Sequence, residues 1–201
     1  DMSGTVLSQA AEFHVTEEEL RAAIESFAGD YMQIPPMYSA LKVNGKKLYE
    51  LAREGKTVER KPRPVHFYEI EILEINLPLV RFCVTCSKGT YIRTLCHDIG
   101  EKLGCGAAME TLLRTKVGRF TLDDAITLAQ TEEAVKNGEI ESKVLGIEEI
   151  LAEYPRVCCT KEGDRLLANG NPLVQAMIDA EKKDGWIRMC NSEGSFAGVY
   201  Q

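Results

Sequence analysis

The stretch CSKGTYIRTL, residues 86–95, contains the change of pattern that decides the fold. Before it, from Val80 to Cys86, apolar residues alternate with polar ones, as in a half-buried strand. After Gly89 the apolar residues recur every three or four positions until Gly104, which is typical of an amphipathic helix. A strand, a glycine turn and a helix are therefore predicted in succession. The start of such a helix carries unpaired N–H groups and a partial positive charge, and so favours an anion.

Arg93 lies in the first turn of this predicted helix, where a cation is disfavoured unless an anion offsets it. We therefore expect a carboxylate or a phosphate beside its guanidinium group. An arginine directed to solvent, with its stem packed on the helix, is an equally good interpretation. Tyr91 lies two residues earlier, so the two side chains do not share one helical face.

Upstream of this stretch the pattern predicts a helix, a long excursion and a strand. The helix is capped by Thr16 and Glu19 and stops at Gly29. The excursion, residues 34–64, begins with two prolines that enforce an extended chain, and it holds a short basic helix at 46–54. Alternation over residues 68–72 predicts the strand. Because long excursions in compact domains tend to be functional, this one is a candidate binding element.

Downstream, strand-like runs are expected over residues 107–113 and around 117–120. An acidic helical stretch follows, with a cap expected at Thr131. Beyond residue 155 we expect a strand at 156–159, a helix ending near Gly170, and a hairpin formed by 186–189 and 196–200. The fold class predicted from these elements is α+β, with a mixed, mainly antiparallel sheet and flanking helices. The predicted organisation is 1–121, a helical connection at 122–154, and a small β domain at 155–201.

The net charge of −7 argues at first against a nucleic-acid partner, but its distribution does not. Residues 42–63 hold eight basic and three acidic side chains, and residues 81–119 hold seven and three. Phosphates respond to the local field within roughly 8 Å, so these two segments are candidates for RNA binding. A pair of solvated charged faces is the alternative interpretation.

The seven cysteines do not have the spacing of a metal site. Cys83 and Cys86 form a C-x2-C pair without a second pair, in a predicted strand where they face opposite sides. We expect reduced structural thiols and no metal. No apolar run approaches the ~20 residues that a bilayer-spanning helix needs, so we expect no membrane partner and a cytoplasmic location.

Four motifs together resemble one family. The string CSKGTYIRTL, with DIGEKLGCGA at 98–107, LLRTKVGRF at 112–120 and QIPPMYSALKVNGKKLYELAREGKTVERKPRPV at 33–65, resembles the TruB family of tRNA pseudouridine-55 synthases. The match runs in order over about residues 1–120. The C-terminal part is similar to the PUA-like RNA-binding appendage of that family, which is expected here only in part.

The resemblance implies isomerisation of a uridine in the T-loop of tRNA, with no metal or organic cofactor. An aspartate attacks the flipped-out nucleotide, and the base detaches, rotates and rejoins through carbon. In the family this aspartate lies in a G-x-L-D-P motif, and none of the eight aspartates of this chain does. We therefore expect a fragment that lacks the nucleophile and is inactive alone.

The resemblance also implies roles for particular residues. Arg93 matches the arginine that pairs with the catalytic aspartate, Tyr91 an active-site tyrosine near it, and Leu112 an apolar residue of the pocket. Residues 34–64 match a thumb loop that closes over the T-loop. The candidate RNA contacts are Tyr38, Lys42, Lys46, Lys47, Arg53, Arg63, Lys88 and Arg114. For any single lysine, a solvated charge is an equal alternative.

Two other functions stay open at this point. The chain would also suit a non-catalytic RNA-binding module, because basic segments need no nucleophile to bind phosphates. It would further suit a guide-RNA-dependent relative of the family, which acts as a subunit of a ribonucleoprotein. The main expectation is a monomer whose partner is tRNA.

Overall fold

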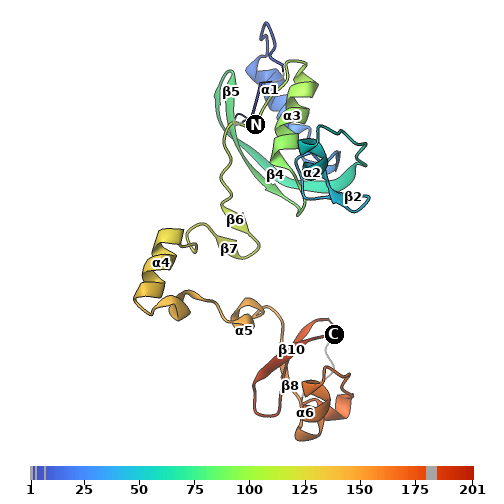
Figure 1. Ribbon diagram of the computed structural model, residues 1–201, viewed down its shortest axis with the longest axis vertical. Coiled ribbons are helices and arrows are strands. Elements are labelled where there is room, and N and C mark those ends of the chain that lie inside the picture. The colour runs from blue at the N-terminus through green and yellow to red at the C-terminus, as the bar shows by residue number, and fades with distance from the viewer. Residues whose placement is uncertain (1, 3, 7, 180–184) are drawn as a thin grey trace. The chain divides into compact units, whose positions relative to one another are not determined.

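The computed structural model describes residues 2, 4–6, 8–179 and 185–201. The chain divides into two compact units, Asp1–Thr115 and Lys116–Gln201 (Figure 1). Each unit has its own sheet and its own buried cluster, and each is described by itself. The domain boundaries predicted at residues 121 and 154 stay predictions.

The first unit is an antiparallel sheet with helices packed on it. Its elements are α1 Glu17–Glu25, β1 Gly29–Gln33, β2 Lys42–Val43, β3 Lys46–Lys47, α2 Leu48–Arg53, β4 Arg63–Asn76, β5 Leu79–Cys86 and α3 Ile92–Leu103. The main sheet has the order β1-β4-β5, with Gln33 opposite Arg63 and Phe67 opposite Cys86. The capping box predicted at Thr16 and Glu19 is present and starts α1.

The core of this unit lies between the sheet and the helices α1 and α3 (Figure 1). Its buried members come from α1 and the turn after it, from β4 and from α3: Leu20, Ile24, Phe27, Val65, Phe67, Leu95 and Ile99. They recur at helical spacing in the two helices and alternate in the strand, so each element buries one face. This packing fixes α3 against the sheet, and with it the position of Arg93.

The excursion between β1 and β4 folds into a small hairpin and a helix. Asn44 and Gly45 both have positive φ, at 51° and 82°, which is the geometry of the tight turn that Asn-Gly favours between two strands. The hairpin leads directly into α2, whose Leu48 and Leu51 are buried. The predicted short helix is therefore confirmed.

The end of α3 is crossed closely by the chain that follows it. Gly104, with φ +72°, ends the helix, and the N–H of Gly106 donates to Gly100 O at 3.1 Å. A Cβ built on Gly100 would lie 2.0 Å from Ala107 N, so only glycine fits there. After this crossing the strand predicted at 107–113 is wrong, because the segment has no regular structure. Its apolar residues do not line a sheet: Leu112 and Leu113 are 56% and 70% exposed.

The second unit contains a three-stranded mixed sheet. Its elements are β6 Lys116–Val117, β7 Phe120–Thr121, α4 Leu128–Lys136, α5 Ile147–Ile150, β8 Arg156–Cys158, α6 Lys161–Ala168, β9 Ile187–Cys190 and β10 Phe196–Tyr200, with 3-10 turns at Ile140–Lys143 and Gln175–Met177. The sheet order is β10-β9-β8, with β8 parallel and β10 antiparallel to β9. Together with the first unit, it gives the α+β class that was predicted.

The cap expected at Thr131 is wrong. Helix α4 begins earlier, after Thr127, whose hydroxyl accepts from Gln130 N while the Gln130 side chain accepts from Thr127 N. Thr131 lies inside the helix, and its hydroxyl donates back to Thr127 O at 3.0 Å. In a capping box, glutamine can accept from the N-cap N–H as glutamate does. The pattern T-x-x-Q at residues 127–130 therefore predicts the start of α4.

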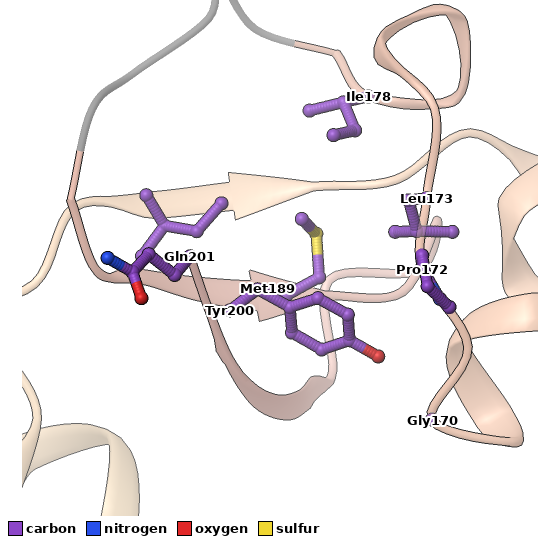
Figure 2. Close-up of a pocket in the computed structure, with 8 residues that line it drawn as sticks. Gly170, Pro172, Leu173, Ile178, Met189, Tyr200 and Gln201 are labelled. Carbon is purple, nitrogen blue, oxygen red and sulfur yellow. The ribbon is translucent and has the colours of Figure 1, made fainter.

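The core of the second unit is a small cluster formed by Val157, Cys159, Leu167 and Met189. Figure 2 shows Leu173, Ile178, Met189 and Tyr200 around a hollow of about 280 Å³ at its edge.

All seven cysteines of the chain are free thiols. Burial is the main cause that raises the pKa of the Cys159 thiol to about 11, and the adjacent Asp164 carboxylate adds to it.

Asp164 ties α6 to the turn between β9 and β10. Its carboxylate accepts from Ser192 N at 2.9 Å, from Ser192 Oγ at 2.6 Å and from Cys159 Sγ at 3.2 Å. The bonds from Ser192 are the largest cause that lowers the pKa of Asp164 below its ordinary 3.8. A lowered folded-state pKa means stability that is present above the unfolded value and lost as pH falls through the folded one.

We therefore expect Asp164→Asn to destabilise the second unit at neutral pH and to flatten its pH dependence below about pH 4. The single tryptophan, Trp186, lies next to β9 and reports this unit's unfolding in denaturant. Asp123→Asn, at an exposed aspartate of the same unit, is the control. An unfolding midpoint of Asp164→Asn that follows the wild-type pH profile would contradict the role of the carboxylate.

Among the residues that the structure describes, each helix is either too short or too polar to traverse a bilayer.

Candidate active site

The start of α3 is shaped by the turn that joins it to β5. Ser87 N donates to His66 O at 2.8 Å, and Ser87 Oγ accepts from His66 N at 2.9 Å, so the turn is fastened to β4. Thr90 Oγ1 donates to Ser87 O at 2.8 Å, and Gly89 supplies the positive φ of +85°. The chain is thereby turned from the sheet into the helix within four residues.

Helix α3 begins after Tyr91, which is its N-cap. Within this described helix the N-cap side chain makes no capping hydrogen bond, and the first turn contains no acidic residue. The partial positive charge of the helix start is therefore not offset from within its own first turn. The positive charge of Arg93 adds to it, and the anion expected near this position stays a prediction.

Arg93 lines a cleft of about 380 Å³ between α3 and the first part of the excursion. The residues around this cleft are Ile34, Pro36, Met37, Tyr38, Arg60, Arg93, Thr94, His97 and Asp98. Arg93 Nη2 donates to Tyr38 O at 3.0 Å, which joins residues that are 55 positions apart in the sequence. The ring of Tyr38 is not buried by this contact, since the residue is 57% exposed.

Arg60 brings a second guanidinium group to the same cleft. It is half-buried, and its Nη1 donates to Pro35 O at 3.1 Å, which closes the end of the excursion onto its beginning. Its Nε is buried without a hydrogen-bond partner among the described residues. The cleft therefore has a guanidinium on the helix side and another on the loop side, and both favour an anionic group.

Asp98 contributes a carboxylate to the cleft, and a side chain of β1 holds it in place. Tyr31 OH donates to Asp98 Oδ2 at 2.9 Å. Burial, followed by this hydrogen bond to the carboxylate, raises the pKa of Tyr31 to about 12. The phenol thus stays protonated at physiological pH and keeps donating, which fixes the Asp98 side chain on its helix.

A basic and aromatic cluster lies on the hairpin and α2. The Lys47 ammonium and the Arg53 guanidinium lie 5.4 and 5.3 Å from the centre of the Tyr49 ring. Lys47 Nζ also donates to Tyr49 OH at 3.3 Å. An aromatic ring between two cations is suited to phosphates and stacked bases. Lys46, 3.3 Å from Glu54 Oε1, extends this basic surface.

The structure brings together some of the residues predicted from sequence. Tyr38 and Arg93 meet at the cleft, with Tyr91 immediately before the helix. Lys42, Lys46, Lys47 and Arg53 lie together on the hairpin and α2, and Arg63 begins β4. The remaining predicted residues are not among those lining the cleft: Leu112, Lys88 and Arg114 are exposed, the first and last in the irregular segment after α3. Their roles stay predictions.

Sequence reasoning did not single out Arg60, Tyr49 or Asp98. The position of Tyr49 could have been predicted. Asn44-Gly45 between two short lysine-containing runs predicts a hairpin, and Tyr49 follows directly after the second of these runs. Asp98 lies at i+5 from Arg93, a spacing that does not indicate a shared helical face. Arg60 is one of eight basic residues in the excursion, and the sequence offers no signal that separates it from the others.

The arrangement has the parts needed to hold an RNA segment and to orient a negative group. Two guanidinium groups line the cleft beside the start of α3, and the excursion also carries the basic hairpin. No group of three or more histidine, cysteine or acidic side chains capable of holding a metal ion occurs within the described part of the chain.

Comparisons with known proteins identify the family of the chain. The model of the TruB family pseudouridylate synthase N-terminal domain matches residues 1–92, and that of the tRNA pseudouridylate synthase B C-terminal domain matches residues 93–152. The tRNA pseudouridine synthase B of Lachnoclostridium phytofermentans is 47% identical over 192 residues, covering 89% of this chain and 62% of the relative. That of Clostridium tetani is 43% identical over 202 residues, covering 100% and 68%.

A solved structure, described as a Cbf5-Nop10-Gar1 complex, superimposes with a TM-score of 0.67 at 26% identity, covering 93% of this chain and 55% of that chain. This chain thus spans about three fifths of the length of the curated relatives, with 62% for the first of them. The cleft with Arg93 lies across the junction of the two matched family models, at residues 92 and 93. From the identity over most of the chain and from both domain matches, it follows that the chain belongs to the TruB family of pseudouridylate synthases.

Proposed function

We propose that this chain is the RNA-binding and arginine-bearing part of a tRNA pseudouridine synthase that isomerises a uridine in the T-loop. The observation that supports this best is the hydrogen bond from Arg93 to Tyr38 O, because it joins the predicted active-site helix to the predicted thumb loop at one cleft. In this proposal the partner is tRNA, no metal or organic cofactor takes part, and the protein acts as a monomer in the cytoplasm.

Each part of the cleft has a role in this proposal. The flipped-out nucleotide enters a space of about 380 Å³, which is within the usual size of small-molecule sites. Arg93 orients the carboxylate that attacks the nucleotide, and Tyr91 supports the base. The hairpin residues Lys42, Lys46 and Lys47 hold phosphates of the T-arm. Their attraction offsets the roughly few kcal/mol that unstacking the base requires.

The test uses a T-arm hairpin RNA with tritium at C5 of its uridines. Isomerisation replaces the C5–H bond by the glycosidic bond, so turnover releases tritium to water. We expect this chain to bind the hairpin in preference to an unrelated stem-loop but to release no tritium. Fusion to the G-x-L-D-P segment of a relative should restore release. Failure to prefer the T-arm hairpin would overturn the proposed function, and release by the unfused chain would contradict the expected lack of a nucleophile.

A non-catalytic RNA-binding module is the second candidate, and the cluster at Tyr49 favours it. Lys47 and Arg53, which contact this ring, can bind phosphates in the absence of a nucleophile. The fusion experiment separates the two functions: binding that persists without tritium release, even after fusion, supports the module.

Lys42→Gln is expected to weaken binding of the T-arm hairpin and to reduce the slope of log affinity against log salt by about one. Lys42 is exposed on β2, and removal of one phosphate contact removes one released counterion. Fluorescence anisotropy titrations at several salt concentrations measure both quantities. Lys136→Gln, at an exposed lysine of α4, is the matched control. Equal salt slopes for the two variants would show that Lys42 does not contact phosphate.

A further inference from the structure

The amide of Gln33 joins the end of β1 to the start of α3. Gln33 Nε2 donates to Tyr91 O at 3.1 Å, and Tyr91 N donates to Gln33 Oε1 at 2.9 Å. The side chain is 1% exposed, which makes it one of the few fully buried polar side chains of the described residues. Both backbone polar groups of Tyr91 are thus paired with a single side chain.

This two-point contact is more restrictive than one hydrogen bond. Two bonds from one amide to the N–H and the C=O of a single residue fix the direction of that residue's backbone as well as its position, as a strand neighbour does. Burying an amide without both bonds is unfavourable, so any other orientation of the Gln33 side chain would raise the free energy of the folded state. Tyr91, the residue that Gln33 holds, is the N-cap of α3, and its orientation sets the direction in which the helix begins.

Gln33 is also where the two sides of the cleft meet. Arg93 lies two residues after Tyr91, and Tyr38, whose carbonyl oxygen accepts from Arg93, lies five residues after Gln33. We propose that Gln33 is a positioning residue of the RNA site: it acts through Tyr91 to set the direction in which Tyr91 and Arg93 face the RNA. This inference rests on the proposed function.

A purely structural role would be to fill the core and satisfy two backbone groups. Gln33→Leu and Gln33→Glu separate the two roles. Leucine has a similar volume but no polar atoms. It leaves Tyr91 N without its partner, while Tyr91 O keeps only the helix bonds from Thr94 N and Leu95 N. A protonated carboxyl can accept from Tyr91 N and donate to Tyr91 O, as the amide does, whereas an ionised carboxylate can only accept.

In the glutamate variant the contact with Tyr91 O therefore depends on pH. Burial raises the pKa of a carboxyl above its ordinary value, and position 33 is buried. The charged or titratable side chains on the surrounding elements include Tyr31 on β1, Arg63 opposite Gln33 on β4, and the cleft residues Arg93, His97 and Asp98 on α3. Their titration is common to the wild-type chain, which is measured over the same pH range and subtracted.

Two readouts are needed on each variant. The first is the backbone amide resonance of Tyr91 in the 15N-tyrosine-labelled chain, which reports the contact without RNA. The second is the dissociation constant for the T-arm hairpin. Ile24→Val, a small deletion in the core of α1, is the control for lost stability alone.

We expect Gln33→Leu to shift the Tyr91 resonance and to weaken hairpin binding by about tenfold at every pH. Gln33→Glu should bind within about twofold of wild type near pH 6 and approach the leucine variant near pH 9. Combined with Arg93→Lys, the effect of Gln33→Leu should shrink to about twofold, because both changes act on one contact. Ile24→Val should lower the thermal midpoint and leave the dissociation constant unchanged.

Hairpin binding by Gln33→Leu at the wild-type level would overturn the inference, as would effects of Gln33→Leu and Arg93→Lys that simply add. If the wild-type chain does not prefer the T-arm hairpin, it is the proposed function that fails. The Tyr91 resonance then decides separately, since an unchanged resonance in Gln33→Leu would show that Gln33 does not hold the start of the helix.

Discussion

Gly100→Ala is expected to destabilise the first unit by about 3 kcal/mol or more, which is at or above the upper end for overpacking a core. The added Cβ would lie 2.0 Å from Ala107 N and 2.3 Å from Gly106 C. Both are backbone atoms, so no side chain can rotate to relieve the contact. Either α3 separates from the crossing segment or the crossing moves, and each disrupts the bond from Gly106 N to Gly100 O.

Thermal unfolding of the variant followed by circular dichroism measures this effect, with amide exchange of β4 and β5 to assign it to the first unit. Two other glycines provide a graded comparison. Gly104→Ala meets no atom within 4 Å but strains a φ of +72°, so we expect a loss of about 1 kcal/mol. Gly146→Ala, at a φ of −66° in open space of the second unit, should leave the midpoint of the first unit unchanged. Equal midpoints for the alanine variants at 100 and 146 would contradict the close crossing.

Arg93→Ala is expected to weaken T-arm binding by about thirtyfold and to remove tritium release from the fused enzyme. The guanidinium contributes a hydrogen bond to Tyr38 O and a positive charge at the cleft. Arg93→Lys keeps the charge but loses the planar pair of donors, so an intermediate loss is expected. Anisotropy gives the affinity, and scintillation counting of released tritium gives the turnover.

Arg81→Ala is the control for Arg93→Ala, since it removes an exposed arginine from β5 in the same unit. The affinity of Arg81→Ala should fall by no more than the loss expected from removing one surface charge. If Arg93→Ala and Arg81→Ala weaken binding equally, Arg93 acts only as a general positive charge. If Arg93→Ala retains tritium release, the proposed role of the guanidinium in the reaction is wrong.

The elements set by local pattern were predictable from the sequence. The capping box at Thr16 fixes where α1 begins, and the alternation in β4 and β5 fixes which face is buried. The position of Arg93 in the first turn of α3 followed from the glycine turn before it. These features depend on residues close together in the chain, so one sequence contains enough information to find them.

Features that depend on distant contacts were not predictable in this way. Residues 107–113 have the composition of a strand, but they follow the crossing at Gly100 and pair with no strand among the described residues. Arg60 joins the cleft because it binds Pro35 O, 25 residues earlier, and no local pattern distinguishes it from its basic neighbours. The amide of Gln33 pairs with Tyr91 across 58 residues, which only the packed fold brings about.

The pairing of β1 with β4 has a consequence for how this protein can evolve. Gln33 and Arg63 are opposite one another in the sheet, so residues 34–62 form a closed loop anchored at both ends. The entropy of closing a flexible loop grows only with the logarithm of its length, and a doubling adds about 0.6 kcal/mol. Insertions and deletions at the exposed Lys56 to Glu59 stretch should therefore be tolerated by the fold. If this loop meets the RNA as proposed, lineages can refit it to differently shaped substrates while the scaffold beneath it stays the same.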